Sequence, residues 1–183
     1  MAQFRKSLAP ILLTSHMRQA TAIAGAVSYF VAVPGVIAGL APWAITGWHI
    51  DGSSNPLRVV AAPLITIGLV PLVAAFGEFV KVGGTPSPTA APDHLVVTGF
   101  NRYVRNPMYI GVLLIILGQA LLFRSVGLVI YGALFWASVA AFVHWYEEPT
   151  LTRRFGLAYD AYRRAVPAWH PRLHSPFSAD EST

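Results

Sequence analysis

Charged and aromatic side chains gather in three short segments in the second half of the chain. The first is Arg102–Gly111 (RYVRNPMYIG), the second is His144–Pro149 (HWYEEP), and the third is Tyr159–Arg164 (YDAYRR). The first segment supplies cations, and the second supplies two carboxylates. A site that combined them would suit a zwitterionic or mixed-charge ligand, because guanidinium groups bind carboxylates and glutamates accept hydrogen bonds from amines and hydroxyls.

Signatures of other enzyme classes are missing from the sequence. It contains no G-x-G-x-x-G after a strand, no P-loop, no H-E-x-x-H and no G-x-S-x-G. It has no cysteine, which excludes disulfides, thiolate metal sites and cysteine nucleophiles. The histidines show no spacing typical of metal ligands, so no metal site is expected.

The elements that must position these segments are predicted to be helices in a membrane. Apolar residues make up 55% of the chain and charged residues only 11%, against about 25% charged residues in a typical soluble domain. The net charge is +5, and the basic residues flank apolar stretches. This pattern indicates anionic lipid headgroups rather than nucleic acid as the partner. We therefore expect one all-α integral membrane domain over residues 1–183.

Four apolar stretches are long enough to be candidate membrane spans. They are residues 21–45, 56–80, 107–123 and 125–146, and residues 1–20 read as an interfacial segment rather than a signal peptide. Only Arg124 separates the last two stretches, which predicts a tight antiparallel hairpin. Such a hairpin would bring the first and second polar segments side by side.

The basic residues also predict an orientation. With the N-terminus inside, 11 of the 13 Lys and Arg residues fall on the cytoplasmic side, and only Arg58 and Arg124 fall on the other. Loops rich in Lys and Arg stay cytoplasmic. We expect an integral protein of a bacterial inner (plasma) membrane, with both termini and the loop 81–106 in the cytoplasm.

A C-terminal amphipathic helix is predicted after the fourth stretch. Apolar and aromatic residues recur there at spacings of four, four, three and four, which places them on one face of a helix. Pro167 should end this helix, which is expected to lie on the membrane or on the ends of the spans. The residues of the face are Leu151, Phe155, Tyr159, Tyr162 and Val166.

The polar segments resemble the isoprenylcysteine carboxyl methyltransferase family, which belongs with the membrane phospholipid methyltransferases. The resemblance covers residues 84–172, and the N-terminal half matches only as generic transmembrane helices. The motifs that carry it, in order, are 84–88 (GTPSP), 95–99 (LVVTG), 102–111, 147–151 (EEPTL), 155–156 (FG), 159–162 (YDAY) and 166–167 (VP), ahead of Trp169 and Pro171-Arg172.

The resemblance implies an integral membrane methyltransferase that uses S-adenosylmethionine. Its acceptor would be a hydrophobic isoprenoid- or lipid-like molecule, possibly methylated on a carboxylate, that enters from the lipid side. The cofactor would lie in a cytoplasm-facing pocket between the last two spans and the C-terminal segment. Carried over by position, the residues of that pocket are Arg105, Asn106, Pro107, Tyr109, Gly111, Glu147 and Glu148.

Residue chemistry adds detail to this implied site. Arg105 can clamp the cofactor carboxylate, and Glu148 can accept from its amino group or ribose, so these two are the candidate catalytic residues. Tyr103 could stack on the adenine or face the sulfonium. His144 lies three and four residues before the two glutamates and would share their face if the helix continues, although a packing histidine is the more common case.

Two departures from the family pattern concern the substrate. The family often has His where this chain has Asn106, and eukaryotic members place a basic residue where this chain has Ala165. Arg163 or Arg164 could replace that basic residue by reaching along the helix. Together with Tyr162, they are the candidate substrate-binding residues.

Two other functions fit the same residues. One is a phospholipid amine N-methyltransferase, which differs in the acceptor atom: an amine or hydroxyl needs a general base, for which Glu148 or His144 would be the candidate, whereas a carboxylate needs none. The other is a non-catalytic membrane scaffold or small transporter subunit. Direct binding of the cofactor would eliminate this second alternative.

Overall fold

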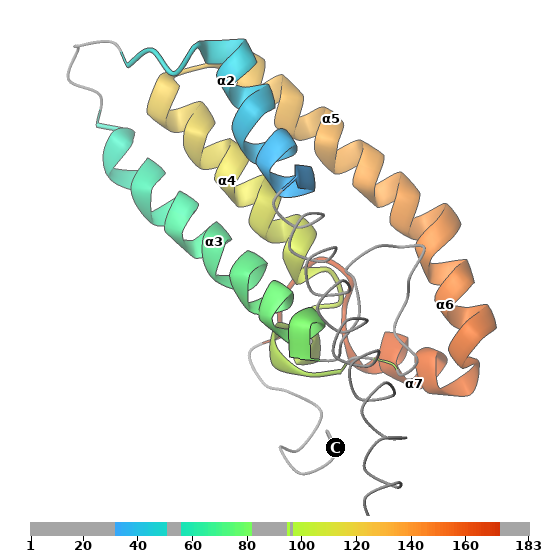
Figure 1. Cartoon of the computed structure of the whole chain (residues 1–183). Coiled ribbons are helices and arrows are strands. Elements are labelled where there is room, and N and C mark those ends of the chain that lie inside the picture. Colours follow the sequence, from blue (N-terminus) through green and yellow to red (C-terminus); the bar gives the residue numbers. More distant parts are fainter. Residues whose placement is uncertain (1–31, 51–55, 82–94, 96, 173–183) are drawn as a thin grey trace, which may run out of the picture.

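The structure, a computed structural model, describes residues 32–50, 56–81, 95 and 97–172, and none of these residues is in a strand (Figure 1). The expected all-α class is therefore confirmed for the described part of the chain. In order, the elements are the π-helical turn η1 (Val36–Leu40), α2 (Ala41–Thr46), α3 (Arg58–Lys81), the 3₁₀ turn η2 (Gly99–Arg102), α4 (Pro107–Phe123), α5 (Val126–Phe142), the π-helical turn η3 (Val143–Glu147), α6 (Glu148–Phe155) and α7 (Leu157–Ala165).

The helices follow the predicted apolar stretches closely. The stretch 56–80 corresponds to α3, and the stretch 107–123 corresponds to α4. The fourth stretch, predicted to end at residue 146, continues as one helix from Val126 to Phe155. Pro149 does not end this helix, although it lies inside it, one residue after the π-helical turn η3.

Two of these helices are long and apolar enough to cross a membrane. They are Arg58–Ala75 within α3 and the 30-residue helix Val126–Phe155, whereas Ala32–Thr46 and α4 are apolar but shorter. Of the first predicted stretch, 21–45, residues 21–31 lie outside the described residues, as do the predicted interfacial segment 1–20 and most of the loop 81–106. A count of four spans stays a prediction.

The hairpin between α4 and α5 forms as predicted. Arg124 ends α4 in the left-handed conformation (φ 51°), with its N–H on the carbonyls of Ala120 and Leu121. Ser125 then caps α5, because its side chain accepts a hydrogen bond from the backbone N–H of Leu128. The connection is short enough to hold the start of α4 beside the end of the long helix.

Helices α3 and α4 pack backbone against backbone. A β-carbon added to Gly68 would lie 2.6 Å from the carbonyl oxygen of Gly111, and one added to Gly111 would lie 2.5 Å from that of Gly68. A β-carbon added to Gly118, two turns further along α4, would lie 2.6 Å from the side chain of Ile65 and 3.0 Å from the carbonyl oxygen of Ala61. Small residues that permit such close approach are typical of helix contacts in membranes, where van der Waals packing replaces the hydrophobic effect.

A proline explains the π-helical turn η1. The backbone N–H of Ala41 donates to the carbonyl of Val36 rather than to that of Ile37, and Pro42 has no N–H. The carbonyls of Ile37 and Ala38 therefore lack the donors that an α-helix would give them, at positions 41 and 42. The side chain of Tyr131 donates to the first (2.9 Å) and that of Gln119 donates to the second (2.7 Å), which fastens this helix to α4 and α5.

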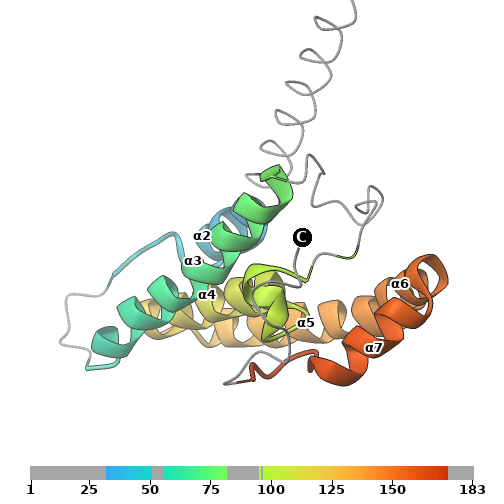
Figure 2. The ribbon, with the colours of Figure 1, turned by 90° about the horizontal axis from the view of Figure 1, so that it is seen from below.

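The predicted C-terminal amphipathic helix is broken, which corrects the expectation of one continuous helix. Gly156 adopts φ 54° and ψ −128°, a conformation open almost only to glycine, and the chain turns sharply between α6 and α7 (Figure 2). The predicted apolar face still gathers in one cluster. Tyr159, Tyr162 and Val166 are buried, and Leu151 and Phe155 pack against them.

The glycine contact between α3 and α4 predicts an asymmetry between two glycines of α3. Gly68→Ala should destabilise the protein by about 1–3 kcal/mol, because the new methyl group meets backbone that cannot yield. Gly77→Ala is the matched control, because its β-carbon would meet nothing within 4 Å. Thermal unfolding in detergent should show a lower midpoint for the first variant only. Equal midpoints for both variants would show that the close approach does not limit stability.

Candidate active site

The segment that leads into α4 runs beside the segment that follows α7. The backbone N–H of Arg105 donates to the carbonyl of Pro167 (2.9 Å), and the N–H of Arg172 donates to the carbonyl of Tyr103 (3.0 Å). The side chain of Asn106, which is buried, donates to the carbonyl of Ala168 (3.2 Å). These bonds hold the first polar segment of the sequence beside the residues that follow the third.

Arg105 joins three elements through one nitrogen. Its Nη1 donates to Oε1 of Glu148 at 2.6 Å and to the hydroxyl of Tyr159 at 3.2 Å. The side chains of Arg105 and Glu148 are only 12% and 16% exposed, so the ion pair is largely shielded from water. A short, shielded, charge-assisted hydrogen bond is the strongest kind that these groups can make.

The two adjacent glutamates both reach toward the start of α4. One turn along α4 from Arg105, the hydroxyl of Tyr109 donates to Oε2 of Glu147 at 3.3 Å. The π-helical turn η3 allows both glutamates to point in this direction. In η3 the N–H of Glu148 donates to the carbonyl of Val143, and a π turn holds more residues than an α turn. Consecutive side chains are then separated by a smaller angle, and Glu147 and Glu148 can face the same neighbour.

Helix α7 closes one side of this centre with two buried tyrosines. The hydroxyl of Tyr162 donates to the carbonyl of Asn101 at 2.7 Å, and the ring of Tyr159 lies beside that of Tyr162. Burial raises the pKa of both phenols above its ordinary value near 10. Both tyrosines therefore stay protonated at neutral pH, and Tyr162 keeps donating to the turn η2.

Two more contacts complete the surroundings. Nη1 of Arg163 lies 3.7 Å from Oε2 of Glu148, with the arginine side chain 49% exposed. The ring of Trp169 packs edge-on against Trp136 of α5, with their centroids 4.4 Å apart. The segment after α7 is thus held at both the polar centre and the long helix.

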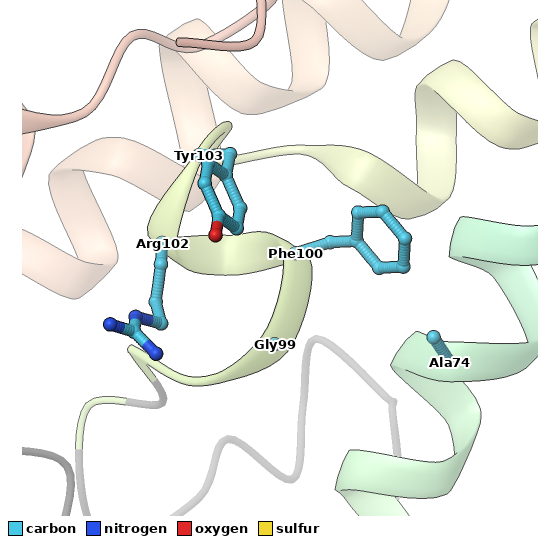
Figure 3. Close-up of a pocket in the computed structure, with 5 residues that line it drawn as sticks. All are labelled: Ala74, Gly99, Phe100, Arg102 and Tyr103. Carbon is cyan, nitrogen blue, oxygen red and sulfur yellow. The ribbon is translucent and has the colours of Figure 1, made fainter. Parts of the chain in front are cut away.

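A separate cavity of about 280 Å³ lies between α3 and the turn η2. Figure 3 shows Phe100 pointing toward α3 and Arg102 pointing away from it. Ala74, Gly99 and Tyr103 also line this space. The predicted residue Tyr103 thus lines this cavity, on the same short connection that carries Arg105.

The sequence-predicted residues divide into two groups. Arg105, Tyr109, Glu147, Glu148 and Arg163 come together as described, so the predicted juxtaposition of the polar segments is confirmed. The others are placed as follows: Pro107 is buried as the first residue of α4, Gly111 is buried against α3, Tyr162 is buried against η2, and His144 and Arg164 are exposed. None of these positions tests a role in ligand binding.

Sequence reasoning missed two members of the arrangement. Tyr159 lies in the third polar segment and on the predicted apolar face but is not among the candidate site residues, yet its hydroxyl contacts Arg105. The carbonyl of Asn101 receives Tyr162, and a backbone group carries no signal in a sequence. The place of Tyr159 in the third polar segment is one hint, and its type is another, since a buried tyrosine usually finds a polar partner for its hydroxyl.

In the described residues, apolar helices carry a centre of mixed charge at one end, formed by Arg105, Tyr109, Glu147 and Glu148. This mixed-charge centre and the helices around it define the class of the protein: an all-α bundle with a largely buried polar cluster. The chain belongs to the phospholipid methyltransferase family, whose model matches residues 57–158, more than half of its 183 residues. The match includes Arg105, Tyr109, Glu147 and Glu148. It also begins at α3, earlier than the motifs that carry the resemblance in the sequence.

One curated relative is similar over a shorter stretch. The chain is 37% identical over 83 residues to the protein-S-isoprenylcysteine O-methyltransferase of Schizosaccharomyces pombe. That stretch covers 44% of this chain and 35% of the relative, so the chain spans about a third of the length of the relative it matches. No solved structure matches the chain.

Proposed function

We propose that this protein is an integral membrane methyltransferase that transfers a methyl group from S-adenosylmethionine to a hydrophobic, lipid-like or isoprenoid acceptor. The observation that carries the proposal is the mixed-charge centre of Arg105, Tyr109, Glu147 and Glu148. It lies within the segment matched by the family. Its side chains come from the start of α4 and the connection before it, and from η3 and α6.

The chemistry of this donor and acceptor set fits the cofactor. S-adenosylmethionine, when bound, supplies an activated methyl group on a sulfonium and presents a carboxylate, an amine and ribose hydroxyls. Arg105 would donate to the carboxylate, and Glu147 and Glu148 would accept from the amine or the hydroxyls. For Tyr103, Asn106, Pro107, Gly111 and His144, a role in cofactor binding stays a prediction, as does acceptor binding by Tyr162, Arg163 and Arg164.

Positioning is the main task of such a site. Methyl transfer is an in-line displacement in which charge is partly neutralised, so holding donor and acceptor in line can supply about 7 kcal/mol or more of the barrier. The buried contacts of Asn106 and Tyr162 would serve this purpose by fixing the segments that carry Arg105 and Tyr159. An acceptor carboxylate would need no general base from these residues.

The membrane placement follows from helix length and surface. The helix Val126–Phe155 has 30 residues and is about 45 Å long at about 1.5 Å per residue, against a hydrocarbon core of about 30 Å. Its polar end would therefore project past the core and hold the centre at the cytoplasmic surface. Large apolar side chains more than half exposed, such as Val59, Ile67, Val126 and Leu134, would face lipid.

The acceptor would approach from that lipid. The relative is named for an isoprenylated cysteine and the family for phospholipids, and both kinds of acceptor carry long apolar chains. Because the family description names phospholipids, methylation of a phospholipid on its amine is the second candidate reaction. A non-catalytic membrane scaffold remains the alternative that the cofactor-binding experiment separates.

We predict that the purified protein binds S-adenosylmethionine through the mixed-charge centre. Arg105→Ala and Glu148→Gln should each weaken binding by about 1.5–3 kcal/mol, the range for a hydrogen bond to a charged group. Isothermal titration calorimetry in detergent measures this. Arg124→Gln is the control, because it removes the same charge from an exposed residue at the opposite end of α4. Wild-type affinity in both site variants, with the fold intact, would remove the centre from the cofactor site.

We also predict that methyl transfer depends on the apolar tail of the acceptor. In a series of acceptors that share one reactive group, kcat/KM should rise roughly fourfold per added methylene while the tail is being buried, since each methylene is worth about 0.8 kcal/mol. Radiolabelled S-adenosylmethionine reports the product. Equal rates for short water-soluble and long-tailed acceptors would contradict entry from the lipid side.

The proposed orientation has its own test. With four spans and both termini in the cytoplasm, reporter fusions placed after Thr183 and near Ser53 should report opposite sides of the membrane, because an odd number of spans separates the two positions. The control is a second fusion on each predicted side. The same side for both positions would contradict the four-span arrangement.

A further inference from the structure

Two neighbouring arginines on α7 differ in what they face. Arg163 and Arg164 are both exposed, and the sequence offers no reason to separate them. Nη1 of Arg163 lies 3.7 Å from Oε2 of Glu148. The carboxylate of Glu148 therefore lies between two guanidinium groups, with Arg105 on its other oxygen.

The two guanidinium groups hold this carboxylate very differently. Arg105 lies 2.6 Å from its carboxylate oxygen, and its side chain is 12% exposed. Arg163 lies 3.7 Å from the other oxygen, and its side chain is 49% exposed. At that length Arg163 makes an electrostatic contact rather than a hydrogen bond. Half-exposed ion pairs are weak, because water and salt screen them. Arg105 therefore fixes Oε1 of Glu148, whereas Arg163 covers Oε2 only through a weak contact that is easily broken.

We propose that Arg163 competes with the cofactor for Oε2 of Glu148, an inference that rests on the proposed function. In the free protein Arg163 neutralises this oxygen. When S-adenosylmethionine binds, a donor from its amine or ribose takes the oxygen, and Arg163 turns out toward solvent, where its exposed side chain has room. Arg105 stays on Oε1 throughout and keeps the carboxylate oriented. Arg163 is thus a positioning residue whose ion pair weakens cofactor binding.

The direction of the change in cofactor affinity when Arg163 is removed distinguishes competition from other roles. Removing Arg163 should tighten cofactor binding, because the ligand no longer displaces an ion pair, and the gain should be about two- to fivefold for a pair of this exposure. A residue that contacts the cofactor favourably would give the opposite sign when removed. A merely structural surface residue would give no change.

The experiment is calorimetric titration of S-adenosylmethionine into wild type, Arg163→Gln and Arg164→Gln in detergent. Arg164→Gln is the matched control, since it removes the same charge one residue further along the same helix. We expect tighter binding for Arg163→Gln alone. Raising the salt concentration to about 0.5 M should reduce the difference in cofactor affinity between Arg163→Gln and wild type, because salt screens the ion pair.

A double-mutant cycle ties the effect to Glu148. In a Glu148→Gln background, the Arg163→Gln change should no longer tighten binding, because the neutral amide offers Arg163 no charge to hold. Equal or weaker binding by Arg163→Gln, or an equal gain in Arg164→Gln, would overturn this inference while leaving the proposed function intact. Absence of binding by wild type would overturn both.

Discussion

The ion pair between Arg105 and Glu148 is the contact on which the polar end of the molecule depends. It joins the entry of α4 to the continuation of the long helix, and the same nitrogen of Arg105 also reaches Tyr159 on α7. Both side chains are largely shielded from water, and a charge left there without its partner would cost about 3–5 kcal/mol. The elements can therefore pack at this end only in an arrangement that brings these groups together.

Away from that end, the fold depends on satisfying backbone groups in apolar surroundings. Each of the two π-helical turns is followed, after one residue, by a proline, Pro42 in one case and Pro149 in the other. Around the first, side chains of other helices, Gln119 and Tyr131, donate to the freed carbonyls and so lock the helices together. The second lies at the polar centre, where the same local device turns two carboxylates toward α4.

Much of this arrangement could be predicted from the sequence. Pro107 marks the start of α4 and the short link at Arg124 marks its end, so the hairpin and the meeting of the polar segments followed from the positions of the apolar stretches. The break at Gly156 could not be predicted in the same way, because the apolar spacing runs through it without interruption. Nor could spacing distinguish Arg163 from Arg164, because only the rotation of α7 after that break decides which of them faces Glu148.

The turn at Gly156 requires glycine because of its backbone conformation and not because of its neighbours. An added β-carbon there would meet nothing within 4 Å, so no neighbouring side chain excludes a larger residue. The obstacle is the backbone itself, whose φ of 54° and ψ of −128° are the mirror image of an extended conformation that ordinary L residues favour. At Gly156 the chain follows the preferences of a D amino acid, and glycine satisfies them because it is the only achiral residue that the genetic code provides.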